Sequence, residues 1–130
     1  LWRSKGIDTR AVFQRDGSGL ARANKISGRF FAQMLTYMAK HPVDGVTLSQ
    51  LMPPVRKRIG KLIPKTPLAE NMVVKSGSMN AVQSFVGYFP AERPKYAWAL
   101  IANNWNGTRA DLRNKMDEML ISVFEQSEIE

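Results

Sequence analysis

The stretch that decides the fold is Asn71-Met72-Val73-Val74-Lys75-Ser76-Gly77-Ser78-Met79-Asn80. It begins with apolar residues and changes to a lysine, two hydroxyls and a glycine. A second apolar run, residues 82–89, follows almost at once. Two such runs with a short polar join predict a β-hairpin, with strands at about 71–76 and 82–89. A glycine inside a strand, here Gly77, indicates a bulge or the close approach of another backbone.

The residues at the end of the first run indicate a binding function for this hairpin. An exposed sheet edge can accept an extended peptide as a further strand. Lys75 offers a positive charge for a carboxylate, Ser76 a hydrogen bond, and Gly77 leaves room for the backbone of a ligand. The hypothesis is therefore an edge that binds an extended peptide ending in a carboxylate.

The chain after the hairpin predicts one more strand and a helix. Residues 95–103 are almost continuously apolar, which predicts a third strand that is buried on both faces. Thr108 and Asp111 resemble a capping box at the start of a long terminal helix. Its apolar face consists of Leu112, Met116, Met119, Leu120, Val123 and Phe124. We expect this helix to cover the apolar side of the antiparallel sheet.

The chain before the hairpin predicts a turn and two helices. Residues 16–19 have the composition of a turn, and Ser27 is a good N-cap for a helix over residues 27–40. The apolar stripe of this helix is Phe30, Phe31, Met34, Leu35 and Met38, and His41-Pro42 ends it. A short second helix contains Leu48, Leu51 and Met52. The predicted fold is α+β: one domain, residues 1–130, with an antiparallel sheet of about three strands and a long C-terminal helix packed on it.

Composition excludes several functions. The chain has 130 residues, 44% of them hydrophobic and 23% charged, which is typical of a globular domain. It has no cysteine and one histidine, so thiolate chemistry is excluded and a histidine triad or multi-histidine metal site is not expected. We expect no cofactor and no metal. No apolar run approaches the ~20 residues of a membrane span. The chain opens with Leu1-Trp2-Arg3, which suggests a fragment or a processed chain without a signal peptide.

The chain has a net charge of +8, and its basic segment Arg56–Lys61 allows two interpretations. One is a patch for nucleic acid or another polyanion. The other is a solvated surface, which is favoured because no aromatic residue is interleaved with the charges as a base-stacking surface requires. Residues 53–70 predict a loop, with one amphipathic turn around Arg56–Leu62. We expect no nucleic-acid partner.

Two segments resemble one known family. Lys75-Ser76-Gly77, within the longer stretch to Tyr88, resembles the Lys-Thr/Ser-Gly signature of penicillin-binding proteins and serine β-lactamases. Upstream, Asp16-Gly17-Ser18-Gly19-Leu20-Ala21-Arg22-Ala23-Asn24 is similar to a segment of one branch, the D-alanyl-D-alanine carboxypeptidase/endopeptidase family (class C low-molecular-mass penicillin-binding proteins). The resemblance spans roughly residues 16–105. The chain departs from it at Ala21, where a serine is usual, and in residues 53–70, where a Gly-Val-Asp-Gly-Thr-like segment is missing.

The resemblance implies roles for individual residues. Lys75 and Ser76 would bind the terminal carboxylate of a D-Ala-D-Ala peptide, and the backbone N–H of Ser78, after Gly77, would be one oxyanion-hole donor. Asp16, Gly17 and Ser18 would form a wall of the cleft and contact substrate. The domain would be the C-terminal part of a penicillin-binding-protein-like transpeptidase domain, with a β-lactamase-like sheet. The partners implied are peptidoglycan peptides and β-lactams, in a bacterial periplasm or other extracytoplasmic location.

The nucleophile of that mechanism is missing. No serine in the chain has a lysine three positions later, as a Ser-x-x-Lys motif requires. Family order puts this motif and the Ser-x-Asn motif upstream of Asp16. Ser78-Met79-Asn80 fits Ser-x-Asn but overlaps the Lys-Ser-Gly motif, so it cannot face it across a cleft. We therefore expect this chain to supply the substrate-binding strand without the nucleophile.

Two other functions stay open. One is a catalytically inactive relative that binds cell wall, and the other is a polyanion-binding module built on the basic segment. A parent with an intact Ser-x-x-Lys motif distinguishes the enzyme from the inactive relative. The missing half of the domain would leave apolar surface uncovered, so self-association of the chain is expected.

Overall fold

The structure, a computed structural model, describes residues 1–18, 24–55 and 59–129. Its elements in chain order are η1 (Arg3–Lys5), β1 (Val12–Phe13), β2 (Lys25–Ile26), α1 (Gly28–Lys40), α2 (Leu48–Leu51), η3 (Ile63–Lys65), α3 (Leu68–Asn71), β3 (Val73–Met79), β4 (Val82–Phe89), β5 (Tyr96–Asn103) and α4 (Arg109–Ile129). Strands β1 and β2 form a small ribbon, and β3, β4 and β5 form the main sheet in that order.

The main sheet is antiparallel throughout, with β4 in the centre. The predicted hairpin and third strand are confirmed. Strand β3 continues past its predicted end at residue 76, and the turn is Asn80-Ala81. The register is unbroken from Val73 opposite Tyr88 to Met79 opposite Val82, so the bulge expected at Gly77 is wrong. A Cβ at Gly77 would lie 2.8 Å from the Ser84 hydroxyl, so the close neighbour is a side chain and not another backbone.

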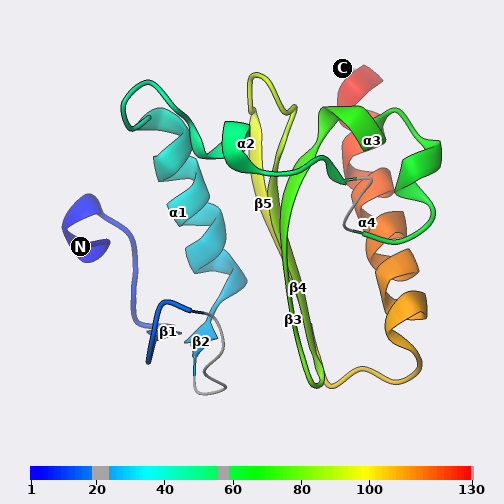
Figure 1. Cartoon of the computed structure of the whole chain (residues 1–130), viewed down its shortest axis with the longest axis horizontal. Coiled ribbons are helices and arrows are strands. Elements are labelled where there is room, and N and C mark those ends of the chain that lie inside the picture. The colour runs from blue at the N-terminus through cyan, green and yellow to red at the C-terminus, as the bar shows by residue number, and fades with distance from the viewer. Residues whose placement is uncertain (19–23, 56–58, 130) are drawn as a thin grey trace.

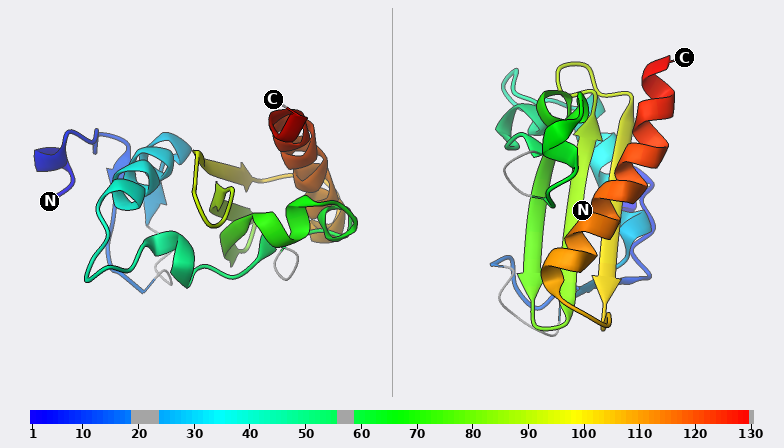
Figure 2. Two further views of the ribbon diagram at one scale, coloured as in Figure 1. Left: turned by 90° about the horizontal axis from the view of Figure 1, so that it is seen from above. Right: turned by 90° about the vertical axis from the view of Figure 1, so that its right-hand side faces the viewer.

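Helices cover both faces of the sheet. Figure 1 shows α1 on one side of the strands and α4 on the other, and the right-hand view of Figure 2 shows α4 crossing the sheet at an angle. The terminal helix therefore lies on the sheet as the sequence predicted. Together these layers form the α+β architecture, with a three-stranded antiparallel sheet between two helical layers.

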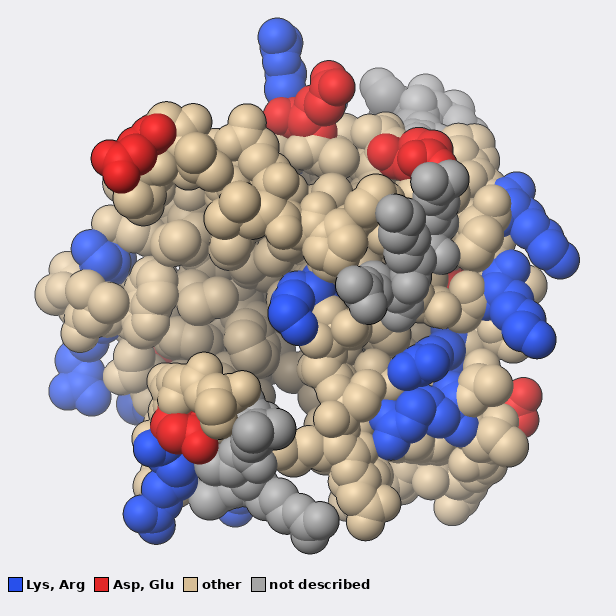
Figure 3. Space-filling model, viewed as in Figure 1, with Lys and Arg blue, Asp and Glu red and all other residues tan. Residues whose placement is uncertain are grey.

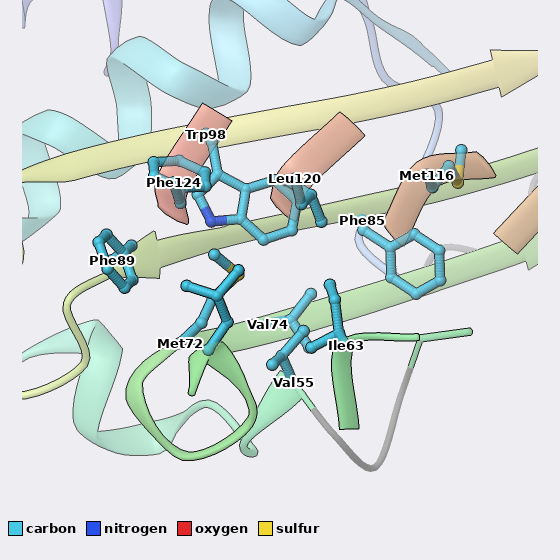
Figure 4. Close-up of a cluster of buried hydrophobic side chains, with 11 residues drawn as sticks. Val55, Ile63, Met72, Val74, Phe85, Phe89, Trp98, Met116, Leu120 and Phe124 are labelled. Carbon is cyan, nitrogen blue, oxygen red and sulfur yellow. The ribbon is translucent and has the colours of Figure 1, made fainter. Parts of the chain in front are cut away.

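The larger part of the core lies between the sheet and α4 (Figure 4). Its buried residues are Val55, Ile63, Leu68, Met72, Val74, Phe85, Phe89, Trp98, Met116, Leu120 and Phe124. Helix α4 contributes the last three, which are four residues apart and so share one face. The apolar face predicted for this helix was too wide, because Met119 and Val123 are 55% and 59% exposed.

The other core cluster lies between the sheet and α1. Its buried residues are Leu35, Val73, Val86 and Tyr88. Successive residues of a strand point to opposite faces, so β4 supplies Phe85 to one cluster and Val86 to the other. Burial on both faces is therefore a property of the central strand β4.

Strand β5 is less buried than the sequence predicted. It contacts both clusters, but only Trp98 is buried and most of its residues are half-buried. The reason is its position at the edge of the sheet. Trp98 lies against β4 at Gly87, where a Cβ would come within 2.9 Å of the indole ring and within 2.1 Å of the Val73 carbonyl oxygen. Only glycine fits between these two groups.

Helices α1 and α2 match the prediction, whereas the loop predicted over residues 53–70 is wrong in part, because it contains η3 and most of α3. The Ser27 hydroxyl accepts a hydrogen bond from the Phe30 N–H at 3.1 Å, and α1 ends at Lys40. The short helix α2 follows after a capping box at Thr47. Residues 56–58 of the predicted basic turn lie outside the described residues. The Thr108 hydroxyl caps α4, accepting from the Asp111 N–H at 3.1 Å.

Tyr88 connects the central strand to α1. Its ring is buried, and its hydroxyl donates a hydrogen bond to the Leu35 carbonyl oxygen. Burial raises the pKa of Tyr88 to about 12, because the phenolate would lose its hydration. The folded chain therefore keeps this proton at pH values where the unfolded chain loses it.

This difference in pKa predicts a loss of stability at alkaline pH. The free energy of unfolding should fall as pH rises from about 10 to about 12, because the unfolded state alone ionises in that window. One of the three tyrosines should therefore titrate late by ultraviolet absorbance. In Tyr88→Phe the late phase should disappear, with a cost of about 1 kcal/mol at neutral pH. A late phase that persists in this variant would contradict the assignment.

Asp117 connects α4 to the loop before η3. Its side chain is fully buried and accepts three backbone hydrogen bonds, from Gly60 at 3.0 Å, Leu62 at 2.9 Å and Ile63 at 3.1 Å. Burial raises the pKa of Asp117, and the three N–H donors act in the opposite direction. Both carboxylate oxygens are used, so the side chain satisfies donors that no other described group reaches.

Replacement of this carboxylate by its amide should therefore destabilise the fold. In Asp117→Asn the new NH₂ group faces at least one N–H that needs an acceptor, which costs about 2 kcal/mol. The measurement is urea unfolding, read as the change in midpoint at constant slope. The neighbouring Glu118 is exposed, so Glu118→Gln is the matched control. Equal midpoints for the two variants would show that the buried hydrogen bonds contribute nothing.

Candidate functional site: the outer edge of strand β3

Strand β3 has one edge that is only partly paired. On its inner edge it pairs with β4 along its whole length. On its outer edge the Val74 N–H donates to Pro53 O at 3.0 Å, and the Val55 N–H donates to Met72 O at 2.9 Å. Beyond Val74, no backbone group of the described residues (1–18, 24–55 and 59–129) pairs with this edge. The unpaired part is the segment from Lys75 to Met79.

The outward direction of the Val74 N–H determines which groups this edge presents. In an antiparallel ladder alternate residues direct both N–H and C=O to the same side. The backbone groups of Ser76 and Ser78 therefore point outward with those of Val74, and those of Gly77 point toward β4. Consistent with this, the Gly77 carbonyl oxygen accepts from the Gln83 amide and from the Ser84 hydroxyl, both at 3.2 Å. The edge thus offers two successive outward N–H groups.

The side chains add a charge and hydroxyls to this edge. Lys75 is exposed, and its Nζ donates to Ser76 O at 2.6 Å. Its positive charge therefore lies beside an outward-facing carbonyl of the edge. A lysine on an unpaired strand also opposes pairing with a second copy of the sheet. Ser76 is half-buried, and Ser78 is exposed.

A groove of about 630 Å³ lies beside the hairpin, on the face of the sheet that α1 covers. Its walls are Gly77, Ser78, Met79, Val82 and Ser84 of the hairpin, Ile101 and Asn103 of β5, and Asn24, Lys25, Ile26 and Phe31 from the opposite side. Seen from the same side as Figure 1, the surface is hollowed between the β1–β2 ribbon and the lower end of the sheet (Figure 3). Gly77 and Ser78 therefore line one wall, and Lys75 and Ser76 lie outside the lining.

The loop containing Asp16, Gly17 and Ser18 is exposed and is connected to the groove through Asn24. The Asn24 side chain accepts from the Arg15 N–H at 2.7 Å and donates to Asp16 Oδ1 at 3.2 Å. The described structure thus brings Gly77 and Ser78 to the same groove as Asn24. The three expected loop residues do not line the groove themselves, and one of them, Asp16, contacts Asn24, which does.

Sequence reasoning assigned no role to three residues of this region. Asn24 lies within the quoted motif, and Gln83 is a polar residue in an apolar strand, which is a signal of a buried hydrogen-bonding group. Gln83 is fully buried. Arg109 donates to Val82 O at 3.0 Å, Gln83 Oε1 at 2.9 Å and Met79 O at 2.8 Å. Nothing in its sequence neighbourhood points to this role.

Neither a metal site nor a membrane-spanning helix is found among the described residues. No group of three or more histidine, cysteine, aspartate or glutamate side chains lies close enough together to hold a metal ion. No described helix is both long enough and apolar enough to cross a membrane.

Comparison with known proteins places the chain in a family. Residues 1–125 match the model of the D-Ala-D-Ala carboxypeptidase 3 (S13) family. The chain is 29% identical to D-alanyl-D-alanine carboxypeptidase DacB of Haemophilus influenzae over 134 aligned residues, which cover 98% of the chain and 27% of that protein.

Two crystal structures of penicillin binding protein 4 (dacB) from Haemophilus influenzae resemble this fold. One has a TM-score of 0.70 at 28% identity, over 91% of this chain and 29% of that one. The other, complexed with a novel β-lactam, has a TM-score of 0.67 at 26% identity, over 91% and 30%. The chain thus spans less than a third of the length of these relatives. With its family model matched along almost its whole length, the chain belongs to the D-Ala-D-Ala carboxypeptidase 3 (S13) family.

Proposed function

We propose that this chain is the C-terminal portion of a serine-type D-Ala-D-Ala carboxypeptidase/endopeptidase that acts on peptidoglycan stem peptides. Its part in that enzyme is to supply the substrate-binding strand. The observation that carries the proposal is the unpaired outer edge of β3, with an exposed lysine and outward N–H groups at Ser76 and Ser78. A peptide can be added to such an edge as a further strand.

In this proposal each residue of the edge has one role. The Lys75 ammonium and the Ser76 hydroxyl bind the terminal carboxylate of the peptide, where a charge-assisted hydrogen bond is about twice as strong as a neutral one. Gly77 leaves the groove open beside the ligand. The Ser78 N–H donates to the oxygen that becomes negative when the scissile carbonyl is attacked. Asp16, Gly17 and Ser18, on the exposed loop that Asn24 connects to the groove, would contact a part of the substrate that extends beyond the groove.

The nucleophile belongs to the part of the enzyme outside this chain. A serine of a Ser-x-x-Lys motif attacks the peptide carbonyl, the terminal D-Ala leaves, and water hydrolyses the resulting acyl-enzyme. No serine here has a lysine three positions later. The chain therefore binds and orients the substrate, and the reaction requires the serine from elsewhere.

One relative supports the ligand class. One of the two crystal structures is of penicillin binding protein 4 complexed with a novel β-lactam. A β-lactam carries a carboxylate beside a strained amide, so it can make the same contacts with Lys75, Ser76 and the Ser78 N–H. The proposed reaction on peptidoglycan implies that the enzyme acts outside the cytoplasm of a bacterium, in the periplasm or another extracytoplasmic location.

The proposed function makes a first prediction about the chain alone. Incubated with a fluorescent penicillin, it should form no covalent adduct, because it has no activated serine. The measurement is denaturing gel fluorescence together with intact mass, with penicillin binding protein 4 as the positive control. A mass increase equal to one penicillin, located on a serine of this chain, would contradict the proposal that the nucleophile lies outside it.

The second prediction concerns the carboxylate contact in the longer protein that carries the serine. Lys75→Gln should slow acylation by penicillin about thirtyfold, because a charge-assisted hydrogen bond is worth about 2 kcal/mol. Reaction with the methyl ester of the same penicillin should differ little between variant and wild type, because the ester has no charge to bind. Lys95 is exposed, and Lys95→Gln is the control. An equal loss with acid and ester would show that Lys75 does not bind the carboxylate.

A further inference from the structure

The tip of the β3–β4 hairpin is connected to α4 by a buried amide. Gln83 lies opposite Ser78 in the register, on the face of the sheet that α4 covers, and it is fully buried. Its Oε1 accepts from the Ser78 hydroxyl at 3.2 Å, Arg109 Nη1 at 2.9 Å and Arg113 Nε at 3.3 Å. Its Nε2 donates to the Gly77 carbonyl oxygen at 3.2 Å. The amide therefore contacts both the backbone before Ser78 and the hydroxyl of Ser78 itself.

Arg109 connects both strands of the tip to the start of α4. Its guanidinium donates to Met79 O at 2.8 Å and Val82 O at 3.0 Å, on the two sides of the turn. The ring of Trp105 lies 4.8 Å from the guanidinium carbon and covers it. Because the fork of an arginine is planar and rigid, two carbonyl contacts fix its orientation and the spacing of the two strands.

The turn between these strands is in a conformation that needs such support. Ala81 has a φ of 59°, in the left-handed region that a residue with a Cβ rarely adopts. The Asn104 N–H donates to Ala81 O at 2.8 Å. A strained turn persists only where surrounding contacts determine it. Here those contacts come from α4 and from the end of β5.

These contacts bracket the N–H of Ser78. The residue before it is held at Gly77 O by Gln83, and the residue after it at Met79 O by Arg109. The outer edge of β3 has no second strand among the described residues to hold it at this point. A donor to a developing oxyanion has to be fixed within a fraction of an ångström of its place, which requires support from neighbouring groups.

We propose that Gln83 and Arg109 are positioning residues of this site, which hold the Ser78 N–H in its direction through Gly77 and Met79. The inference rests on the proposed function, because it gives the Ser78 N–H a role in the reaction. It adds that the position of this oxyanion donor is controlled from the face of the sheet that α4 covers, by Gln83 of β4 and Arg109 of the first turn of α4.

The sharpest variant is Gln83→Glu. The carboxylate has nearly the same shape and keeps acceptors for Arg109 and Arg113, but it loses the donor to Gly77 O and places a negative oxygen beside that carbonyl. Arg109→Lys is the second variant, because it keeps the charge and loses the two-pronged contact with Met79 and Val82. Lys115, exposed on the same helix, gives the control Lys115→Gln.

The first measurement is amide hydrogen exchange of the chain itself. The N–H groups of Gly77 and Met79 point toward β4 and report on opening of the tip. Both variants should speed their exchange about tenfold, and the amide of Val86, farther along β4, should exchange as in the control. Unchanged exchange at Gly77 and Met79 in both variants would overturn the inference. Should Gln83→Glu fail to fold, Arg109→Lys decides alone.

The second measurement is acylation of the longer protein by penicillin, resolved into reversible affinity and the rate of the covalent step. The variants should lower that rate about tenfold with little change in affinity, because the carboxylate contact at Lys75 is intact and only the oxyanion donor is displaced. A purely structural role would lower the fraction of active protein and leave the rate of that fraction unchanged, and that result would also overturn the inference. Absence of labelling in the wild type would instead refute the proposed function.

Discussion

The constraint on which the rest of this structure depends is the pairing of β3 on one side only. Up to Val74 the strand has neighbours on both edges, and its side chains are in the core, with Val74 fully buried and Val73 8% exposed. After Val74 the outer neighbour ends, and the residues become polar at once. Unpaired backbone donors must face water or a ligand, because burial without a partner is costly. The change from Val-Val to Lys-Ser-Gly-Ser follows the change in pairing.

The same constraint explains why the edge carries a lysine, a glycine and hydroxyls and not a more typical strand sequence. An open apolar edge would pair with another copy of the chain. The ammonium of Lys75, beside the outward carbonyl of Ser76, opposes such pairing and leaves the N–H groups accessible. The lysine that opposes edge-to-edge pairing is thus also the group that, in the proposed function, a peptide carboxylate would contact. Stability and the proposed function make the same demand on this segment.

Much of the fold could be predicted because periodicity and burial agree along the chain. The helix from Ser27 and the strands 82–89 and 95–103 have strong local signals, and all were found near their predicted bounds. The prediction was wrong where neighbours distant in sequence decide. Gly77 and Ser78 stay in the strand because Ser84 and Gln83 pair with them. Met119 and Val123 are exposed because α4 crosses the sheet at an angle, so its contact stripe is narrower than its apolar stripe.

The candidate site divides in the same way. Lys75, Ser76 and Gly77 are contiguous and form a motif, so the sequence indicates them. Asn24 lies within the Asp16–Asn24 motif, and its partners Arg15 and Asp16 are eight or nine positions away. Gln83 and Arg109 act through contacts between segments that are far apart, such as Met79 and Arg109, which are separated by 30 positions. No local pattern marks such a contact. Only the buried glutamine gave a hint, because a polar residue inside a strand that is otherwise apolar requires partners.

Helix α4 is the element through which these distant parts are connected. Its first turn holds the hairpin tip through Arg109, its middle holds the loop at residues 60–63 through Asp117, and its last described core residue, Phe124, packs against Phe89. Because the hydrogen bonds of a helix fix the spacing of its residues, these three contact points have a fixed spacing along α4. The edge of β3 is therefore held at a defined place by a helix that touches none of its outward groups. In the proposed function the outer side of β3 has to stay open for the peptide, so the precision of its donors has to come from the face of the sheet that α4 covers.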